Sequence, residues 1–283
     1  MFLVLISLLL TASLALPVKA QMGGFGRKGM GGERPAGMKQ AETPSDNPTL
    51  SSDGVERRDH EIKATGLTAA FPAGFACEPV ASPYASPHRH DGSKRRGDRN
   101  NGLHGGIDLS LKEGTPLLAV ASGEVIARGE GGQLEGIFLW LRHAPTDTGL
   151  PFWIFSKYQH LSTLPDLKEG NRVHVGQVVA RSGGTGTAGG YYGAAGYPHL
   201  HLSTHYGPSK EYTVKGMHGS MVQGQGAVLD DPLILYLRDV NTLNQIHDLP
   251  EARRKVDIAV LGEDGAVYPA GSTSVWPVRC IRK

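Results

Sequence analysis

Two short motifs contain the side chains that zinc accepts as ligands. His104 and Asp108 flank Gly105-Gly106-Ile107, and much later in the chain His199 and His201 flank a single leucine. A catalytic zinc ion has three protein ligands with nitrogen or oxygen donors and keeps its fourth position for water. Such an ion lowers the pKa of that water to about 7 and polarises a carbonyl group, which makes amide hydrolysis feasible at neutral pH. The motifs therefore indicate a hydrolytic metal centre with His104, Asp108 and one histidine of the second pair.

The spacing within each motif constrains the backbone. On a straight strand His104 and Asp108 would lie roughly 13 Å apart, which is too far to share one metal ion. We therefore expect the chain to bend between them, as the two glycines permit. His199 and His201 face the same side of a strand, with Cα atoms about 6 to 7 Å apart. One of these rings can bind the metal while the other faces the bound water, and spacing alone does not decide which.

Hydrolysis also requires a proton acceptor, and the chain has no His-Glu-x-x-His motif that would supply a glutamate base. His160 and His199 are the candidates, because an unperturbed imidazole titrates close to neutral pH. His205 continues the strand parity of His199 and His201, which makes it an alternative ligand. His88 and His90, in a loop rich in proline and arginine, are expected to be solvated.

The elements that must position these residues are predicted to be mostly strands. The chain has 283 residues with 39 glycines and 18 prolines, a composition that favours turns and short strands over long helices. Consecutive strands with short turns predict an antiparallel sheet. An N-cap and a proline at Asp230-Asp231-Pro232 predict one helix, over Leu233 to Val240. The expected strands cover Leu117 to Val120, Glu124 to Ala127, Ile137 to His143, Phe152 to Tyr158 and Val173 to Ala180, with a β-like tail over Val256 to Trp276.

From about Asn101 to Leu202 the sequence resembles the lysostaphin-like, or LytM-type, zinc endopeptidases of peptidoglycan. The resemblance implies a mostly β, LytM-like catalytic domain (a duplicated hybrid motif) with an antiparallel sheet and few short helices. It also implies zinc on His104, Asp108 and His201, with His160 and His199 orienting or activating the water and stabilising the oxyanion. The motifs that carry the resemblance occur in family order: the two ligand motifs, Gly114-Thr115-Pro116 with Ala119, Gly123-Glu124-Val125, Tyr158-Gln159-His160-Leu161, Gly170 to Gly176 and Gly183 to Gly186.

Two segments depart from the short family pattern, and both are expected to border the cleft. Pro145 to Pro151 lengthens the connection before the strand that leads to His160. Gly183 to Tyr197 is a long loop before the histidine pair, and its tyrosines Tyr191, Tyr192 and Tyr197 either stack on substrate or are ordinary exposed residues. The charge run Lys94-Arg95-Arg96 is expected to be solvated.

The ends of the chain predict export. Residues 1–20 combine an apolar run with Val18-Lys19-Ala20, a pattern typical of a cleavable signal peptide, although the lack of a positive charge before the run leaves a membrane anchor as the alternative. Residues 21–63 are predicted to be a flexible linker, residues 64–250 the zinc metallopeptidase domain and residues 251–283 a C-terminal β extension. The two cysteines, Cys77 and Cys280, are predicted to form a disulfide, with two free buried thiols as the alternative.

These features predict an exported, periplasmic or secreted zinc endopeptidase that hydrolyses amide bonds in peptidoglycan stem peptides or cross-bridges. A net charge of +2 gives no field that would imply nucleic acid as a partner, and no stable membrane insertion is expected after signal cleavage. One alternative is a non-catalytic LytM-type module that binds the wall or activates another hydrolase. Another is a peptidase of exported proteins, because zinc chemistry does not specify the amide. A regulatory protein partner is left open.

Overall fold

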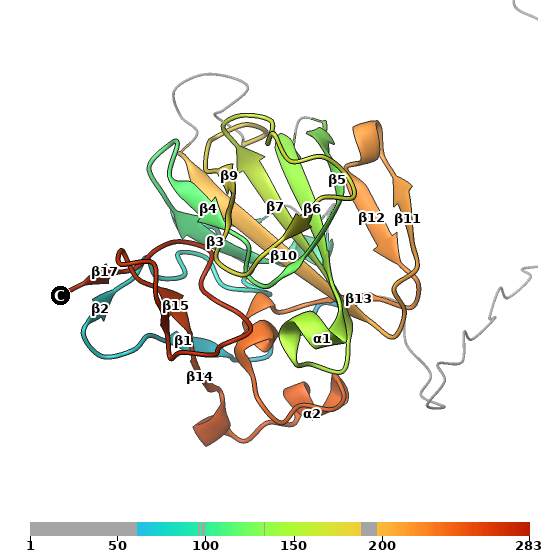
Figure 1. Ribbon diagram of the computed structural model, residues 1–283. Helices are drawn as coiled ribbons and strands as arrows, with labels where there is room; N and C mark the ends of the chain where they lie inside the picture. Colours follow the sequence, from blue (N-terminus) through green and yellow to red (C-terminus); the bar gives the residue numbers. More distant parts are fainter. Residues whose placement is uncertain (1–60, 96, 98–99, 133, 188–196) are drawn as a thin grey trace, which may run out of the picture. The chain divides into compact units, whose positions relative to one another are not determined.

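The computed structural model describes residues 61–95, 97, 100–132, 134–187 and 197–283, all of which belong to the compact unit Pro48–Lys283 (Figure 1). The predicted signal peptide, residues 1–20, and most of the predicted linker, residues 21–60, lie outside the described residues. No helix in the described part of the chain is long and apolar enough to cross a membrane.

The largest element is a seven-stranded sheet in which every pairing is antiparallel. Its strands follow the order β13-β10-β7-β6-β5-β8, and β3 pairs with β10 beside that path (Figure 1). The predicted antiparallel sheet is therefore confirmed. The strands of this sheet are β3 (Ile107–Ser110), β5 (Gly123–Glu130), β6 (Ile137–His143), β7 (Trp153–Leu161), β8 (Arg172–Val173), β10 (His199–Gly207) and β13 (Val228–Asp230).

Short paired strands surround this sheet, and the described residues contain few helices, as the sequence predicts. The smaller strands are β1 (Thr68–Ala70), β2 (Phe75–Ala76), β4 (Pro116–Leu118), β9 (Val178–Arg181), β11 (Tyr212–Lys215), β12 (Met221–Gly224), β14 (Lys255–Asp257), β15 (Val260–Leu261), β16 (Val267–Tyr268) and β17 (Ile281–Arg282). The α-helices are α1 (Pro145–Thr148) and α2 (Asn244–His247), and the 3-10 turns are Asn100–Gly102, Met217–Gly219, Pro232–Tyr236 and Glu251–Arg253.

The two faces of the sheet carry different kinds of side chain, because successive residues of β10 point alternately to one face and to the other. Leu200 and Leu202 point to the face that carries the main hydrophobic core. His199 and His201 occupy the alternate positions and so point to the opposite face. Farther along, that opposite face carries a second apolar cluster that the β11–β12 hairpin covers with Val222 and Tyr212. The histidines therefore lie on the face opposite the main core, next to the second apolar cluster.

A single buried tyrosine links the sheet to the layer above the core. The hydroxyl of Tyr158, in β7, donates to the carbonyl of Leu118 and accepts from the amide of Val120, with oxygen and nitrogen partners both 2.9 Å away. Because Leu118 ends β4, these bonds fix the β4–β9 pair against the central strand. The strand that leads to His160 is therefore tied to the β4–β9 pair through Tyr158.

Two predicted elements have different forms in the structure. The helix expected over Leu233 to Val240 is a 3-10 turn, Pro232–Tyr236, although Asp231 caps it as predicted by accepting from the amide of Leu233. All five of its residues are buried, so packing on every side holds one tight turn in place of an amphipathic helix. The strand expected over Val173 to Ala180 is divided into β8 and β9, because Gly176 adopts a positive φ of 76°.

The insertion Pro145 to Pro151 does not border the metal centre, which corrects the expectation from the sequence. It contains α1 and precedes Trp153, the first residue of β7, whereas His160 lies near the other end of that strand. Seven residues of extended chain separate Trp153 from His160, which is about 23 Å. The insertion packs elsewhere: the Asp147 carboxylate pairs with Arg172, and the hydroxyl of Thr273 donates to the carbonyl of Thr148.

The C-terminal residues pack together with the start of the described chain. β14 runs parallel to β1, and β17 pairs with β2. The Cys77–Cys280 disulfide joins these segments across 203 residues of sequence, which confirms the predicted bridge. Trp276 is fully buried in the main core, and its indole nitrogen donates to the carbonyl of Glu78. Residues 255–282 therefore contribute to the same core as the central sheet.

Candidate metal centre

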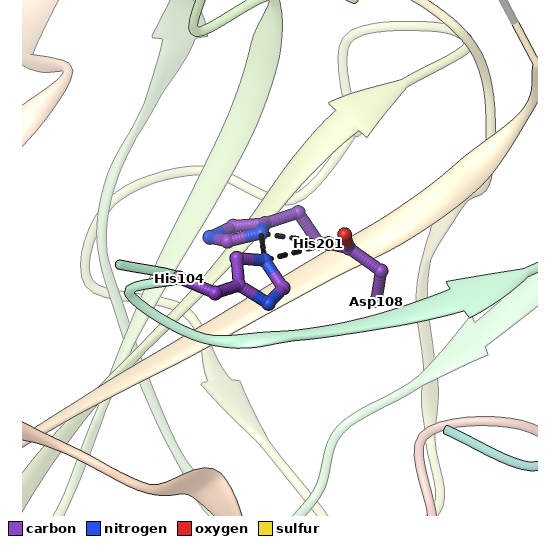
Figure 2. Close-up of side chains that lie close together, drawn as sticks. All are labelled: His104, Asp108 and His201. Carbon is purple, nitrogen blue, oxygen red and sulfur yellow. Dashed lines mark hydrogen bonds and ion pairs between the residues drawn. The ribbon is translucent and has the colours of Figure 1, made fainter. Parts of the chain in front are cut away.

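His104, Asp108 and His201 converge at the edge of the sheet where β3 pairs with β10 (Figure 2). The register places Asp108 directly opposite His201 on the neighbouring strand, and His104 precedes β3. His104 Nε2 lies 3.1 Å from Asp108 Oδ1 and 3.0 Å from His201 Nδ1. His201 Nδ1 lies 2.9 Å from Asp108 Oδ1. Each side chain thus offers one atom to a common point.

The glycines between His104 and Asp108 make this convergence possible. The chain bends at Gly105 and Gly106 before β3 begins, as the spacing predicts. A Cβ atom on Gly106 would lie 2.3 Å from the carbonyl oxygen of Leu202 and 3.0 Å from the ring of His201. Any side chain at Gly106 would therefore displace the ring that completes the cluster.

The donor set fits a zinc ion. Ligands about 2.0 to 2.1 Å from a tetrahedral zinc lie roughly 3.3 Å from one another, close to the separations of 2.9–3.1 Å between these three atoms. His104 Nδ1 lies 2.9 Å from the carbonyl oxygen of Pro83, so that nitrogen carries the ring proton and donates it. The facing Nε2 of His104 then presents a lone pair, which is the form that binds a metal.

The local electrostatics keep Asp108 and His201 in the protonation states that metal binding requires. Burial acts to raise the pKa of Asp108, but the close contacts of its carboxylate with the rings of His104 and His201 outweigh it and hold that pKa well below its usual range. Burial lowers the pKa of His201 to about 4, against the opposing effect of Asp108. At neutral pH the cluster therefore combines an ionised carboxylate with a neutral His201 ring.

His160 and His199 lie beside the cluster with their rings 4.6 Å apart. His160 Nδ1 donates to the carbonyl oxygen of Thr185 at 2.8 Å, and His199 Nδ1 donates to that of Tyr197 at 3.2 Å. Each Nε2 is consequently the basic nitrogen of its ring. His199 Nε2 lies 3.9 Å from Asp108 Oδ1, at the border of the cluster.

His160 has an unusual backbone conformation, and the surroundings of both His160 and His199 shift the pKa of their rings. His160 has a φ of +63°, a conformation that few residues other than glycine adopt. Burial lowers the pKa of His160 and of His199, and for His160 the neighbouring histidines lower it further. Both rings are therefore neutral at pH 7 and able to accept a proton at Nε2.

The expectation that the charge run Lys94-Arg95-Arg96 is solvated is wrong for Arg95. Its side chain is 18% exposed, and Nη2 lies 3.3 Å from Asp108 Oδ2 and 2.9 Å from the Ser82 hydroxyl oxygen. A run of charges normally marks a solvated surface, so no local pattern distinguishes Arg95 from Lys94, which is exposed. Arg96 lies outside the described residues. The pairing of Arg95 arises because residues 81 and 82 hydrogen-bond to the backbone of Asp108.

The other sequence candidates lie outside the ligand cluster. His205 follows on the same face of β10, but its ring lies 5.5 Å from that of Trp140 and not among the three donors. His88 and His90 are exposed, as expected, although the His90 ring contacts that of Tyr197. Tyr197 stacks on His199 with ring centroids 4.6 Å apart. Tyr191 and Tyr192 lie outside the described residues.

Known proteins match the segment that carries this centre. Residues 102–215 match Peptidase family M23. The chain is 32% identical over 115 residues to the Peptidoglycan DD-endopeptidase ShyC of Vibrio cholerae, covering 41% of this chain and 21% of ShyC. It is 34% identical over 107 residues to Lysostaphin of Staphylococcus simulans, covering 36% of this chain and 18% of that protein. The match thus spans about a fifth of the length of these relatives.

A solved structure gives a weaker match of the same kind. The catalytic domain of the antimicrobial peptidase lysostaphin from Staphylococcus simulans is 26% identical, with a TM-score of 0.33, covering 51% of this chain and 84% of that chain. Because that score is low, the assignment rests on the sequence matches, which include all five histidine and aspartate residues described above. Residues 102–215 of the chain are therefore similar to Peptidase family M23 (LytM-type) domains.

Proposed function

We propose that this protein is a zinc-dependent endopeptidase that hydrolyses amide bonds in the peptides of peptidoglycan. The observation that carries the proposal is the convergence of His104, Asp108 and His201, whose donor atoms lie within 2.9–3.1 Å of one another. Three such protein ligands are typical of a catalytic zinc site, because a structural site takes four. When bound there, zinc supplies an acidified water molecule and polarises the carbonyl of the amide.

The residues His160 and His199 would move the protons of the reaction. Each is neutral at pH 7 and has its Nδ1 hydrogen bonded to a backbone carbonyl, which leaves Nε2 available as the proton acceptor. One Nε2 can accept the proton of the attacking water, and the resulting imidazolium can donate it to the leaving amine. The other ring would stabilise the negative charge on the carbonyl oxygen only after taking up a proton itself, because its Nε2–H could then donate to that oxygen.

Peptidoglycan as the substrate is supported by similarity to one relative, the Peptidoglycan DD-endopeptidase ShyC of Vibrio cholerae. Export of the chain is supported by the leader-like residues 1–20 and by the Cys77–Cys280 disulfide, since such bonds persist in oxidising compartments. The complete ligand set favours an enzyme over a non-catalytic module, which would not require all three donors.

The proposal is tested by digesting purified peptidoglycan with the zinc-loaded protein and identifying the released peptides by mass spectrometry. We expect products with one new amino terminus and one new carboxyl terminus for each bond cut. The Asp108→Asn variant is the matched control and should release none. Intact peptidoglycan with zinc bound would favour the wall-binding alternative, and cleavage of casein but not of peptidoglycan would identify a peptidase of proteins.

A further inference from the structure

Arg95 contacts the carboxylate of Asp108 from outside the ligand cluster. It belongs to an excursion of the chain, residues 86–95, that starts beside His104, whose amide donates to the carbonyl of Ser86 at 3.1 Å. The excursion is held by a bridge between His88 and Lys94 and by the Arg95 amide, which donates to the carbonyl of Pro87 at 2.9 Å. Although the preceding Lys94 is exposed, the Arg95 side chain turns back into the protein. Its position therefore requires an explanation other than a solvated surface.

The two oxygens of Asp108 have separate partners. Oδ1 faces the nitrogens of His104 and His201 at 3.1 and 2.9 Å. Oδ2 accepts a hydrogen bond from Arg95 Nη2 at 3.3 Å. The Asp108 side chain is only 7% exposed, so water does not compete freely for either oxygen. Arg95 thus determines which oxygen of the carboxylate is left for the cluster.

Ser82 fixes the guanidinium on the same strand pair that carries Asp108. Its hydroxyl oxygen accepts from Arg95 Nη2 at 2.9 Å. Its carbonyl accepts from the amide of Asp108 at 2.9 Å, so Ser82 and Asp108 form a backbone bridge. Main-chain hydrogen bonds between Ser82 and Asp108 therefore help to fix the position of the Arg95 guanidinium relative to the carboxylate. The conformation of the long Arg95 side chain is not the only determinant.

Stability does not account for this arrangement. The Arg95 side chain is only 18% exposed, and taking a charge out of water costs free energy that its partner must offset. Its Nε is buried without a hydrogen-bond partner among the described residues. Buried groups with unmet hydrogen bonds are rare in native proteins, and functional sites are among the places where they are found.

We infer that Arg95 is a positioning residue that holds Oδ2 of Asp108, so that Oδ1 alone is offered to the metal. This inference rests on the proposed metal centre. Residues that hydrogen-bond to metal ligands orient them, and their loss typically costs about 10- to 100-fold in metal affinity or activity. Lysine cannot replace arginine fully, because its flexible ammonium lacks the rigid planar guanidinium whose Nη2 contacts the Asp108 carboxylate and the Ser82 hydroxyl.

The test compares Arg95→Met, Arg95→Lys and the exposed neighbour Lys94→Met in the full chain. Zinc affinity is measured by competition with a chromogenic chelator, and the coordination of the metal by the visible absorption of cobalt-substituted protein. We expect Arg95→Met to lose about 10- to 100-fold in zinc affinity. Its cobalt bands should weaken, because a freed Oδ2 raises the coordination number. Arg95→Lys should be intermediate, and Lys94→Met should match the wild type.

The inference would be overturned if Arg95→Met bound zinc within twofold of the wild-type affinity and showed unchanged cobalt bands. Equal losses of zinc affinity in Arg95→Met and Lys94→Met would also overturn it. If Arg95→Met does not fold, wild-type zinc affinity and cobalt bands in Arg95→Lys would overturn it instead. A wild-type protein that binds no zinc would remove the proposed metal centre and this inference with it. Zinc binding without hydrolysis would remove only the proposed activity, because the affinity and the cobalt bands still report on Arg95.

Discussion

The metal centre and the region around the disulfide both join distant parts of the chain, but they do so by opposite means. In the centre, His104 meets His201 across 97 residues through polar atoms about 3 Å apart. Around the disulfide, Cys77 meets Cys280 across 203 residues through a covalent bond, beside the fully buried Trp276 and the edge-on ring of Phe71. The first arrangement places donors where a metal can bind them, and the second excludes water.

The difference indicates that function and stability are carried by separate regions. Substitutions in the centre should remove metal or turnover while the fold persists, because the apolar core and the disulfide are untouched. Substitutions near the disulfide or in the core should lower the free energy of unfolding and leave the metal in place. The predictions below test this separation, beginning with the largest expected effect.

Asp108→Asn should empty the metal centre. The amide keeps the size of the side chain but removes the charge, so zinc affinity should fall by more than the roughly 100-fold that the loss of an outer hydrogen-bond partner can cause. Hydrolysis should be lost with the metal. Metal analysis by mass spectrometry checks the first effect, and circular dichroism checks that the fold is retained. Full zinc occupancy in this variant would remove Asp108 from the ligand set.

His160→Asn should keep the metal but slow hydrolysis by about a hundredfold or more, the usual loss for a general acid-base group. Asparagine tolerates the positive φ at this position, and its amide can replace the bond to the Thr185 carbonyl. The substitution therefore removes Nε2 with little strain. Turnover and zinc content must be measured on the same preparation. A fully active variant would exclude His160 from the mechanism.

Replacing both Cys77 and Cys280 by alanine should lower the free energy of unfolding by roughly 2 to 4 kcal/mol, because the unfolded chain gains freedom. Denaturant titration measures this loss. Zinc affinity should not change, since the disulfide joins β2 and β17 and contacts none of the ligands. A parallel loss of zinc would show that the two regions are coupled, contrary to the comparison.

The fully buried His143, which bonds to Ser122 and Ser156, should make stability depend on pH. Burial lowers its pKa to about 4 in the folded protein, from about 6.5 when exposed. The unfolded chain therefore takes up the proton first, and stability is present above pH 6.5 and lost as the pH falls towards 4.

Comparing the metal-free protein with its His143→Gln variant isolates this contribution, which should reach on the order of 3 kcal/mol at pH 4. The carboxyl of Asp231, whose pKa burial raises to about 6, acts in the opposite direction but is present in both proteins. Its effect therefore cancels in the difference. A difference in unfolding free energy that does not change between pH 7 and pH 4 would contradict the prediction.

The sequence predicts the parts of the molecule that local rules determine. Alternation along His199-Leu200-His201-Leu202 predicts which rings share a face, and the glycines after His104 predict the bend. With only two cysteines in the chain, the disulfide has one possible partner for each. Each of these follows from strand geometry or from composition, without knowledge of distant contacts.

The sequence does not predict features that depend on long-range packing. Arg95 contacts Asp108 because Ser82 pairs with that strand, and nothing in the charge run signals the pairing. The insertion at Pro145 precedes the strand of His160 in the sequence, yet the length of that strand carries it away from the centre. The buried turn at Pro232 has the cap of an α-helix but is packed on all sides.

The assignment of His201 as the ligand and His199 as its neighbour is the central claim, because both rings face the same side of β10. His201 Nδ1 lies within 3.0 Å of both other donors, whereas His199 Nε2 is 3.9 Å from the nearest carboxylate oxygen. The zinc content of His201→Ala and His199→Ala, purified in parallel, tests it most directly. We predict that His201→Ala is empty and that His199→Ala retains zinc but turns over slowly. Zinc retained by His201→Ala and lost by His199→Ala would contradict the account.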